Sequence, residues 1–385
     1  MSGRNERSLA RAARRVVVKV GSGVPTDDGD LRPRVFTELA RQIAALCAEG
    51  RQVVLVSSGS IAAGSRALGW SHSGRTVPEK QAAAAVGQIG LCEIYRKRFQ
   101  RHGRAVAQVL LTRPGLADRE RYLNARHTLA ALLRLGVVPI VNENDTVATE
   151  EIRFGDNDNL SATVVDLVGA ELLVILTDVD GFHAAPPEPG RPRAALLDVV
   201  PRITPEIERA AGVSASARGR GGMVTKLEAA RTAARSGAAT VICNGRRRDV
   251  LLRVAAGEDV GTLFLAGSPM GSKKHWLAHT ARPVGSLVVD EGAARALRER
   301  GRSLLPAGVV TVEGGFGIGD LVSCRDPADR EIARGLSAYA SEEVDRIKGL
   351  GTREIGRVLG YSNGDEVIHR DDLVLVADLP GETGS

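Results

Sequence analysis

The sequence has no long apolar run, few cysteines and few aromatic residues. No stretch of about 18 uncharged apolar residues occurs, so we expect no membrane-spanning helix. The cysteines form no Cys-x-x-Cys pair and the histidines show no paired spacing, so zinc sites and a disulfide framework are not expected. The first residues carry no apolar stretch ahead of a cleavage site, so we expect no secretory signal and a cytoplasmic location.

Lysine is scarce as well, because nearly all of the positive charge is arginine. The net charge is +6 and the pI is about 9.4. This mild excess suits a protein that handles anionic substrates, and it is weak evidence for a nucleic-acid partner. The length of 385 residues suggests two domains, and a 43% hydrophobic fraction beside 25% charged residues is typical of a folded globular protein.

The first two-thirds of the chain alternates short apolar runs with helical patterns. Strands are expected at residues 15–20, 53–56, 105–111, 137–141, 172–176 and 239–243. Helices are expected at residues 33–49, 79–100, 118–135, 161–168 and 226–236, with a further small-residue helix after residue 60. Continuous apolar strands alternating with helices are typical of a mainly parallel sheet sandwiched by helices. We therefore predict an α/β catalytic domain over residues 11–267.

The pattern changes near residues 267–272, which have the composition of a turn or linker. Residues 268–282 are interpreted as a linker, and a small, mostly β domain is predicted over residues 283–378. Short strands are expected there at 286–289, 308–312, 321–324, 332–336 and 373–376, with 292–300 as the only helix. The two ends of the chain, roughly 1–10 and 379–385, are expected to be frayed.

Two lysines stand at positions that favour anion binding, and one of them is at the carboxyl end of a strand, where a parallel sheet places its ligands. Lys19 ends the first strand beside glycines, and Lys226 begins a helix after a glycine-rich loop. Phosphoryl transfer needs positive charge on the phosphates more than it needs covalent chemistry, and a helix N-terminus also favours anions. For Lys19 alone, a solvated charge at a strand end is the alternative. The two lysines together with three glycine loops favour the functional interpretation.

Carboxylates and amides gather after the strand at 137–141. Asp145, Asn157 and Asp158 can hydrogen-bond a substrate ammonium or orient the lysines, and the cluster is interpreted as handling substrate and Mg²⁺. Asx-turn and N-cap roles are the structural alternative. Ser58, at a predicted helix N-terminus, suits a substrate carboxylate. The sequence has no GxxxxGK(S/T) motif and no GxGxxG motif opening a helix after the first strand, which disfavours Walker-type and dinucleotide sites.

These segments, taken in order, resemble the glutamate 5-kinases, a family with the amino-acid-kinase fold. The resemblance is carried by Val17–Ser22, Ser58–Gly64, Leu110–Arg113, Asn142–Asp145, Gly155–Ser161 and Gly221–Lys226. The tail, from Val289–Ala293 through Ser303–Gly308, resembles the PUA domain that follows the kinase in bacterial members. The match extends over about residues 13–378, and its motifs are jointly specific although each alone is weak.

The resemblance implies ATP-dependent phosphorylation of the γ-carboxylate of L-glutamate, which is the first step of proline biosynthesis. It implies that Lys19 and Lys226 stabilise the transferring phosphoryl group, that Asp158 orients them, and that glutamate is held by Ser58, Asp145 and Asn157. It implies an ATP site formed by Lys19, Thr177, Asp178, Arg220, Gly221, Gly222, Met223, Val224, Thr225 and Lys226. The implied cofactors are ATP and Mg²⁺, without a metal site built by the protein itself.

The resemblance further implies feedback inhibition by proline and a homo-oligomer, either a dimer or a tetramer. This sequence departs from the family pattern at Arg220, where threonine is usual, and at Phe182-His183, where a Leu-Tyr pair is usual. Two other functions are considered. One is a different amino-acid kinase, acting on acetylglutamate, aspartate or carbamate. The other is an RNA-binding protein that acts through the PUA-like domain, although the tail lacks interleaved aromatic and basic residues.

Overall fold

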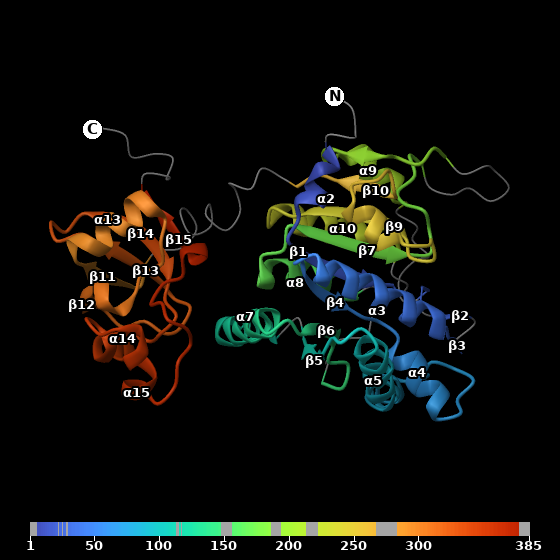
Figure 1. Cartoon of the computed structure of the whole chain (residues 1–385), viewed down its shortest axis with the longest axis horizontal. Coiled ribbons are helices and arrows are strands. Elements are labelled where there is room, and N and C mark those ends of the chain that lie inside the picture. The colour runs from blue at the N-terminus through green and yellow to red at the C-terminus, as the bar shows by residue number, and fades with distance from the viewer. Residues whose placement is uncertain are drawn as a thin grey trace. The chain divides into compact units, whose positions relative to one another are not determined.

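The computed structural model describes residues 6–376 except 22, 25, 28–29, 113–114, 117, 148–155, 186–193, 213–221 and 267–282. These residues form two compact units (Figure 1). The first unit contains the described residues up to 116 and those from 128 to 266, and the second contains 118–127 and 283–376. The predicted linker lies outside the described residues. The segment 118–127, expected in the first domain, groups with the second unit.

An eight-stranded sheet forms the centre of the first unit, in the order β5-β6-β4-β1-β7-β9-β10-β8. Every neighbouring pair is parallel except β9 and β10, which are antiparallel. The strands are β1 (Arg15–Val20), β4 (Gln52–Val56), β5 (Val106–Leu111), β6 (Val138–Glu143), β7 (Leu172–Thr177), β8 (Val199–Val200), β9 (Ala239–Asn244) and β10 (Thr262–Phe264). The six predicted strands of this domain are thus confirmed to within two residues, and β8 and β10 were missed. After β1 in the chain, β2 (Thr26–Asp27) and β3 (Asp30–Leu31) pair antiparallel and form a separate two-stranded sheet.

The helices of this part of the chain are α2 (Ser8–Ala12), α3 (Pro33–Ala48), α4 (Ser60–Ala67), α5 (Val77–Gln100), α7 (Arg119–Arg134), α8 (Asp156–Val168), α9 (Pro205–Ala210), α10 (Met223–Arg235) and α11 (Val250–Ala255), and residues 119–127 of α7 group with the second unit. Helices α3, α5, α8, α10 and α11 pack against strands of the sheet. Side chains alternate along β1, so Val16, Val18 and Val20 belong to the core that α3 and α5 complete. Lys19 therefore points to the opposite face, which is the face that α8 covers. The alternation of side chains along β1 thus turns Lys19 toward α8.

Helices α4 and α5 pack backbone against backbone at two glycines. A Cβ on Gly64 would lie 1.7 Å from the carbonyl oxygen of Ala83, and a Cβ on Gly87 would lie 1.9 Å from that of Ser60. Both distances are too short for any side chain, so only glycine allows this approach. The turn before α4 needs a third glycine, because Gly59 has a φ of +108°, in the left-handed region. The polar residues ahead of α4 are thereby held close to α5.

Residues 8–10 begin α2 and Arg7 is buried, so the expectation of a frayed end at residues 1–10 was wrong for residues 7–10. Residues 1–5 and 379–385, of which the same was expected, lie outside the described residues. Arg7 is 2% exposed, and its guanidinium donates to the carbonyl oxygens of Val260 and Gly261 at 3.0 Å. It also forms ion pairs with Asp198 and Asp259. A single long-range cation therefore fixes the start of the chain to loops at the far edge of the sheet. Such an interaction leaves no pattern in the local sequence.

The second unit contains a five-stranded sheet in the order β12-β11-β13-β14-β15. Its strands are β11 (Gly285–Val289), β12 (Val309–Glu313), β13 (Leu321–Arg325), β14 (Glu331–Leu336) and β15 (Leu373–Leu375), and only β11 and β13 pair in parallel. Its helices are α13 (Glu291–Arg300), α14 (Ser341–Ile347) and α15 (Ile355–Leu359), with 3-10 turns at Pro306–Gly308, Thr352–Glu354 and Arg370–Asp372. The prediction of a single helix there was wrong, whereas the strand-rich character is confirmed.

Across the part of the chain that the structure describes, no helix combines the length and the apolar sequence that crossing a bilayer requires. The fold class predicted from the sequence, a mainly parallel sheet between helices followed by a small strand-rich domain, is confirmed.

Candidate active site

Lys19, Asp158 and Lys226 come from three different elements and form one buried group of charges. Lys19 lies near the end of β1, Asp158 in the first turn of α8, and Lys226 in the first turn of α10. The Nζ atom of Lys19 is 2.6 Å from Oδ1 of Asp158, and the Nζ atom of Lys226 is 3.3 Å from Oδ2. The three residues are 4%, 0% and 6% exposed in chain order. One carboxylate between two ammonium groups gives this buried group of three charges a net positive charge.

Burial and ion pairing act in opposite directions on these groups. Burial alone would raise the pKa of Asp158, but the ammonium groups of Lys19 and Lys226 outweigh it and hold that pKa below its usual value. For Lys19, burial is the largest effect and lowers the pKa of the ammonium, an effect that Asp158 opposes and Lys226 strengthens. Asp158 therefore stays ionised and helps to keep Lys19 protonated.

The backbone near these lysines leaves room for an anion. Gly21 follows β1 and donates its N–H to the carbonyl oxygen of Leu176 at 2.9 Å. A Cβ on Gly21 would lie 3.1 Å from that oxygen, which is a tight contact, and 3.6 Å from Nζ of Lys19, which is ordinary van der Waals contact. On the other side, Gly222 is the N-cap of α10 and places Lys226 at the positive end of that helix. The two lysines thus share a space that is small, positively charged and bounded by backbone.

Thr225 contributes to this charged group instead of standing apart from it. Its hydroxyl donates to Oδ2 of Asp158 at 2.7 Å and is 2.9 Å from the carbonyl oxygen of Gly222. The resemblance had implied an ATP contact for Thr225, and the structure places its hydroxyl on the carboxylate that pairs with both lysines.

A second group of polar residues surrounds Asn157, the residue before Asp158 in α8. The Nδ2 of Asn157 donates to Oγ of Ser58 at 2.9 Å, to the carbonyl oxygen of Ser57 at 3.0 Å and to Oδ1 of Asn142 at 3.1 Å. Its Oδ1 is buried and has no hydrogen-bond partner among the described residues. Successive helix residues point in different directions, so Asn157 faces this amide group while Asp158 faces the lysines.

Asp145 lies beside the same turn. It follows β6 and is 9% exposed, and its Oδ2 accepts a hydrogen bond from the hydroxyl of Ser60 at 3.2 Å. Ser60 is the first residue of α4, two positions after Ser58. The structure therefore places Ser58, Asp145 and Asn157, which the resemblance assigned to one substrate, around the turn that precedes α4. Asn142 belongs with them and was given no role of its own by sequence reasoning, although it lies in a quoted motif.

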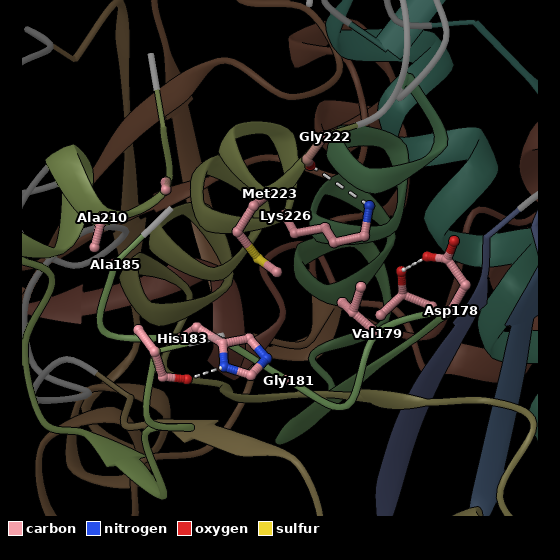
Figure 2. A pocket seen from close by; sticks show the side chains of 12 residues that line it. Asp178, Val179, Gly181, His183, Ala185, Ala210, Gly222, Met223 and Lys226 are labelled. Carbon is pink, nitrogen blue, oxygen red and sulfur yellow. Dashed lines mark hydrogen bonds between the residues drawn. The ribbon is translucent and has the colours of Figure 1, made fainter. Parts of the chain in front are cut away.

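A cavity of about 240 Å³ opens next to Lys226 (Figure 2). In Figure 2 the ammonium of Lys226 and the carboxylate of Asp178 lie toward one end, and Ala185 and Ala210 lie toward the other. The cavity therefore has a charged end and an apolar end. Its lining residues are Thr177, Asp178, Val179, Gly181, His183, Ala185, Ala194, Ala210, Ala211, Gly222, Met223 and Lys226.

Five of the residues that the resemblance assigns to ATP line this cavity, whereas the described residues Lys19, Val224 and Thr225 do not. Thr177, Asp178, Gly222, Met223 and Lys226 are in its wall. Val224 is 38% exposed on α10, and Arg220 and Gly221 lie outside the described residues.

Sequence reasoning missed the apolar end of the cavity, which small residues from separate segments build. It noted His183 only as a departure from the family. The imidazole of His183 donates from Nδ1 to the carbonyl oxygen of Ala194 at 2.7 Å, so this ring is fixed in the wall. An alanine carries no sequence signal for such a position.

The other reactive side chains do not form a competing site. Burial raises the pKa of the Cys243 and Cys324 thiols to about 12, which makes them inert as nucleophiles. Within the described ranges, no group of three His, Cys, Asp or Glu side chains is arranged to hold a metal ion.

Comparison with known proteins gives consistent matches over nearly the whole chain. The model of the amino acid kinase family matches residues 14–244, and that of the PUA domain matches residues 285–359. A glutamate 5-kinase of Nitrosococcus oceani is 53% identical over 374 residues, covering 97% of this chain and 100% of that protein. Glutamate 5-kinases of Pelobacter propionicus and Geobacter sulfurreducens are 51% and 52% identical, covering 96% and 94% of this chain and 100% and 98% of those proteins.

Proposed function

This chain belongs to the glutamate 5-kinase family of amino acid kinases, and from that premise we propose how it phosphorylates the γ-carboxylate of L-glutamate with ATP. The product is γ-glutamyl phosphate, in the first step of proline biosynthesis. The observation that carries the proposal is the buried group of Lys19, Asp158 and Lys226, with its excess of positive charge. A transferring phosphoryl group spreads negative charge over its oxygens, and preorganised cations in a dry site stabilise that charge.

In this proposal the two lysines act on the phosphoryl group and Asp158 acts on the lysines. Lys19 and Lys226 approach the same carboxylate from different elements, so their ammonium groups are fixed relative to each other before substrate binds. Asp158 offsets their mutual repulsion and keeps Lys19 charged. Since the ion pairs already hold the ammonium groups in place, little reorganisation is required when charge develops in the transition state.

Glutamate is held on the Asn157 side of α8. The carboxylate of Asp145 and the unpartnered Oδ1 of Asn157 are acceptors, and they suit the α-ammonium of the substrate. The hydroxyl of Ser58 and the N-terminus of α4 suit its α-carboxylate. The adjacent positions of Asn157 and Asp158 then bring the bound amino acid next to the lysines.

ATP occupies the cavity beside Lys226, with its phosphates at the charged end and its base at the apolar end. Thr177, Asp178 and the segment from Arg220 to Lys226 contact it. Phosphate oxygens and water would supply most of the ligands of a Mg²⁺ ion that binds with the nucleotide, as is usual for this ion. Asp178 is the carboxylate in the cavity wall that could contact such an ion, because Asp158 is already paired with two lysines.

The proposed activity is tested by a coupled assay of ADP release with glutamate, ATP and Mg²⁺. ADP release is expected to depend on glutamate, and acetylglutamate, aspartate and carbamate are expected to support little. Trapping the acyl phosphate with hydroxylamine gives a hydroxamate, and identifying that product as the γ isomer rather than the α isomer assigns the γ-carboxylate as the acceptor. ADP release that is independent of glutamate, or greater with another acid, would contradict the proposal.

Inhibition by proline, assembly as a dimer or tetramer, and a cytoplasmic location complete the proposal on the strength of family membership. Adding proline to the same assay and measuring molar mass by light scattering test the first two. RNA binding through the PUA domain is the second candidate function, favoured by the match at residues 285–359. Filter binding across a salt series tests it, because phosphate contacts make affinity fall steeply as salt rises.

A further inference from the structure

Two buried side chains of α5 contact residues that accept hydrogen bonds from Asn157. The Oε1 of Gln88 accepts a hydrogen bond from Nδ2 of Asn142 at 2.9 Å, and the hydroxyl of Tyr95 is 3.0 Å from Oγ of Ser57. Gln88 is 8% exposed and Tyr95 is fully buried. The two lie seven residues apart, which is two helical turns, so they project from one face of α5.

Backbone groups fix which way the amide of Asn142 points. The N–H of Glu143 can only donate, so the Asn142 atom that lies 2.9 Å from it must be the oxygen Oδ1. The nitrogen Nδ2 of Asn142 then faces Gln88, and the Gln88 atom that receives it must be Oε1. The remaining Nε2 of Gln88 donates to Sγ of Cys92 at 3.3 Å. Gln88 is therefore the acceptor that satisfies the buried amide nitrogen of Asn142.

The same reasoning fixes the orientation of the side-chain amide of Asn157. The carbonyl oxygen of Ser57 can only accept, so the atom of Asn157 that lies 3.0 Å from it is Nδ2. That nitrogen also donates to Ser58 and Asn142, so its two hydrogens are used within the protein. Only the Oδ1 of Asn157 is therefore left to interact with a ligand, and this buried oxygen has no partner among the described residues. An acceptor in that position selects a ligand with a donor, such as an ammonium group.

We propose that Gln88 and Tyr95 are positioning residues, through which α5 sets the affinity for the amino-acid substrate by fixing the orientation of Asn157. The proposal rests on the proposed function, because it takes the α-ammonium of glutamate as the group that Oδ1 of Asn157 accepts. Without Gln88, the buried Nδ2 of Asn142 has lost its acceptor, which is costly inside a protein. Asn142 then turns toward another acceptor, and Asn157 loses one of the contacts that aim its oxygen.

A purely structural role for Gln88 is the competing explanation, and the chain offers a matched control. Gln42, in α3, is 3% exposed, and its Oε1 accepts a hydrogen bond from the backbone N–H of Leu251 at 2.9 Å. Replacing either glutamine by methionine keeps the side-chain length and leaves one buried N–H without its acceptor. Gln88→Met and Gln42→Met are therefore expected to lower the unfolding temperature by similar amounts.

The experiment measures unfolding temperature and steady-state kinetics for the full chain, with glutamate varied at saturating ATP and the reverse. Gln88→Met is expected to raise the glutamate KM about tenfold, which corresponds to about 1.4 kcal/mol, with the ATP KM changed less than about twofold. Gln42→Met is expected to leave both constants within about twofold of wild type. Tyr95→Phe removes only a hydroxyl and is expected to raise the glutamate KM about threefold.

Equal effects of the two methionine variants on glutamate KM would overturn the proposal, as would a Gln88→Met enzyme whose ATP KM rose as much as its glutamate KM. If Gln88→Met does not fold, the Tyr95→Phe variant tests the proposal instead. An unchanged glutamate KM in Tyr95→Phe would then contradict the positioning role. Assays of the wild-type protein distinguish failure of the positioning role from failure of the proposed function. A folded wild-type protein without glutamate-dependent ADP release would refute both, whereas normal wild-type activity with unaltered variants refutes only the positioning role.

Discussion

Replacing Asp158 by asparagine removes the carboxylate that lies between two buried ammonium groups. Asparagine keeps the shape of the side chain and can still accept the hydrogen bond from Thr225, so the change is chiefly one of charge. Removing one partner of a buried ion pair typically costs about 3–5 kcal/mol of unfolding free energy, because the remaining charge is left uncompensated. We expect a clear fall in unfolding temperature at neutral pH. We also expect kcat to fall by roughly 10²-fold or more, because the lysines are no longer held in place.

The pH dependence of this variant provides the sharper test. Burial already lowers the pKa of Lys19 from 10.5, and Asp158 opposes that effect, so the pKa falls further when Asp158 is neutralised. Between that lowered pKa and 10.5, the lysine is neutral in the folded protein and protonated in the unfolded chain. The unfolded state then binds more protons, so stability rises with pH over this window. Activity is expected to fall over the same window, because a neutral lysine cannot stabilise the phosphoryl group.

The comparison variant is Thr225→Val, which removes a hydrogen bond to Asp158 and leaves all three charges in place. A hydrogen bond to a charged group contributes about 1.5–3 kcal/mol, so we expect a moderate loss of stability without the opposed pH trends. Thermal unfolding and the coupled assay are run on the same preparations across the pH series. An Asp158→Asn enzyme that lost stability as pH rose, or that kept the wild-type kcat, would refute the reasoning about the coupled charges.

Three further outcomes are expected. Lys19→Ala and Lys226→Ala should each lower kcat by roughly 10²-fold or more with little change in the glutamate KM, because the lysines act mainly in the transition state. A near-normal kcat in initial-rate assays would remove that lysine from the mechanism. Asp145→Ala should raise the glutamate KM and leave the ATP KM nearly unchanged, and the reverse pattern would assign Asp145 to the nucleotide. Gly64→Ala should lower the unfolding free energy by about 1–3 kcal/mol or more in urea titrations, since its Cβ would lie 1.7 Å from the Ala83 carbonyl oxygen. A urea midpoint equal to that of the wild type would show that α4 can move away from α5 at little cost.

The sequence by itself determined six of the eight strands in the sheet of the first unit and the position of the two lysines. Runs such as that of β1 are almost entirely β-branched and end at glycine, so their conformation follows from neighbouring residues. Lys19 is recognisable because it ends such a run, and Lys226 because a glycine-rich loop precedes it. The helices α14 and α15 were missed because they have only seven and five residues, too few for a helical period to be recognised.

Only the tertiary structure decided which polar groups meet and which atoms they present to a ligand. Asp158 could have capped its own helix, but the fold places its carboxylate between two lysines from other elements. Asn157 could have presented either end of its amide, and contacts with a carbonyl oxygen and two side chains leave only its oxygen for the substrate. Sequence patterns record local conformation and indicate which residues are buried. The direction of a buried side chain depends on partners that are distant in the chain, because every buried donor and acceptor has to be satisfied at once.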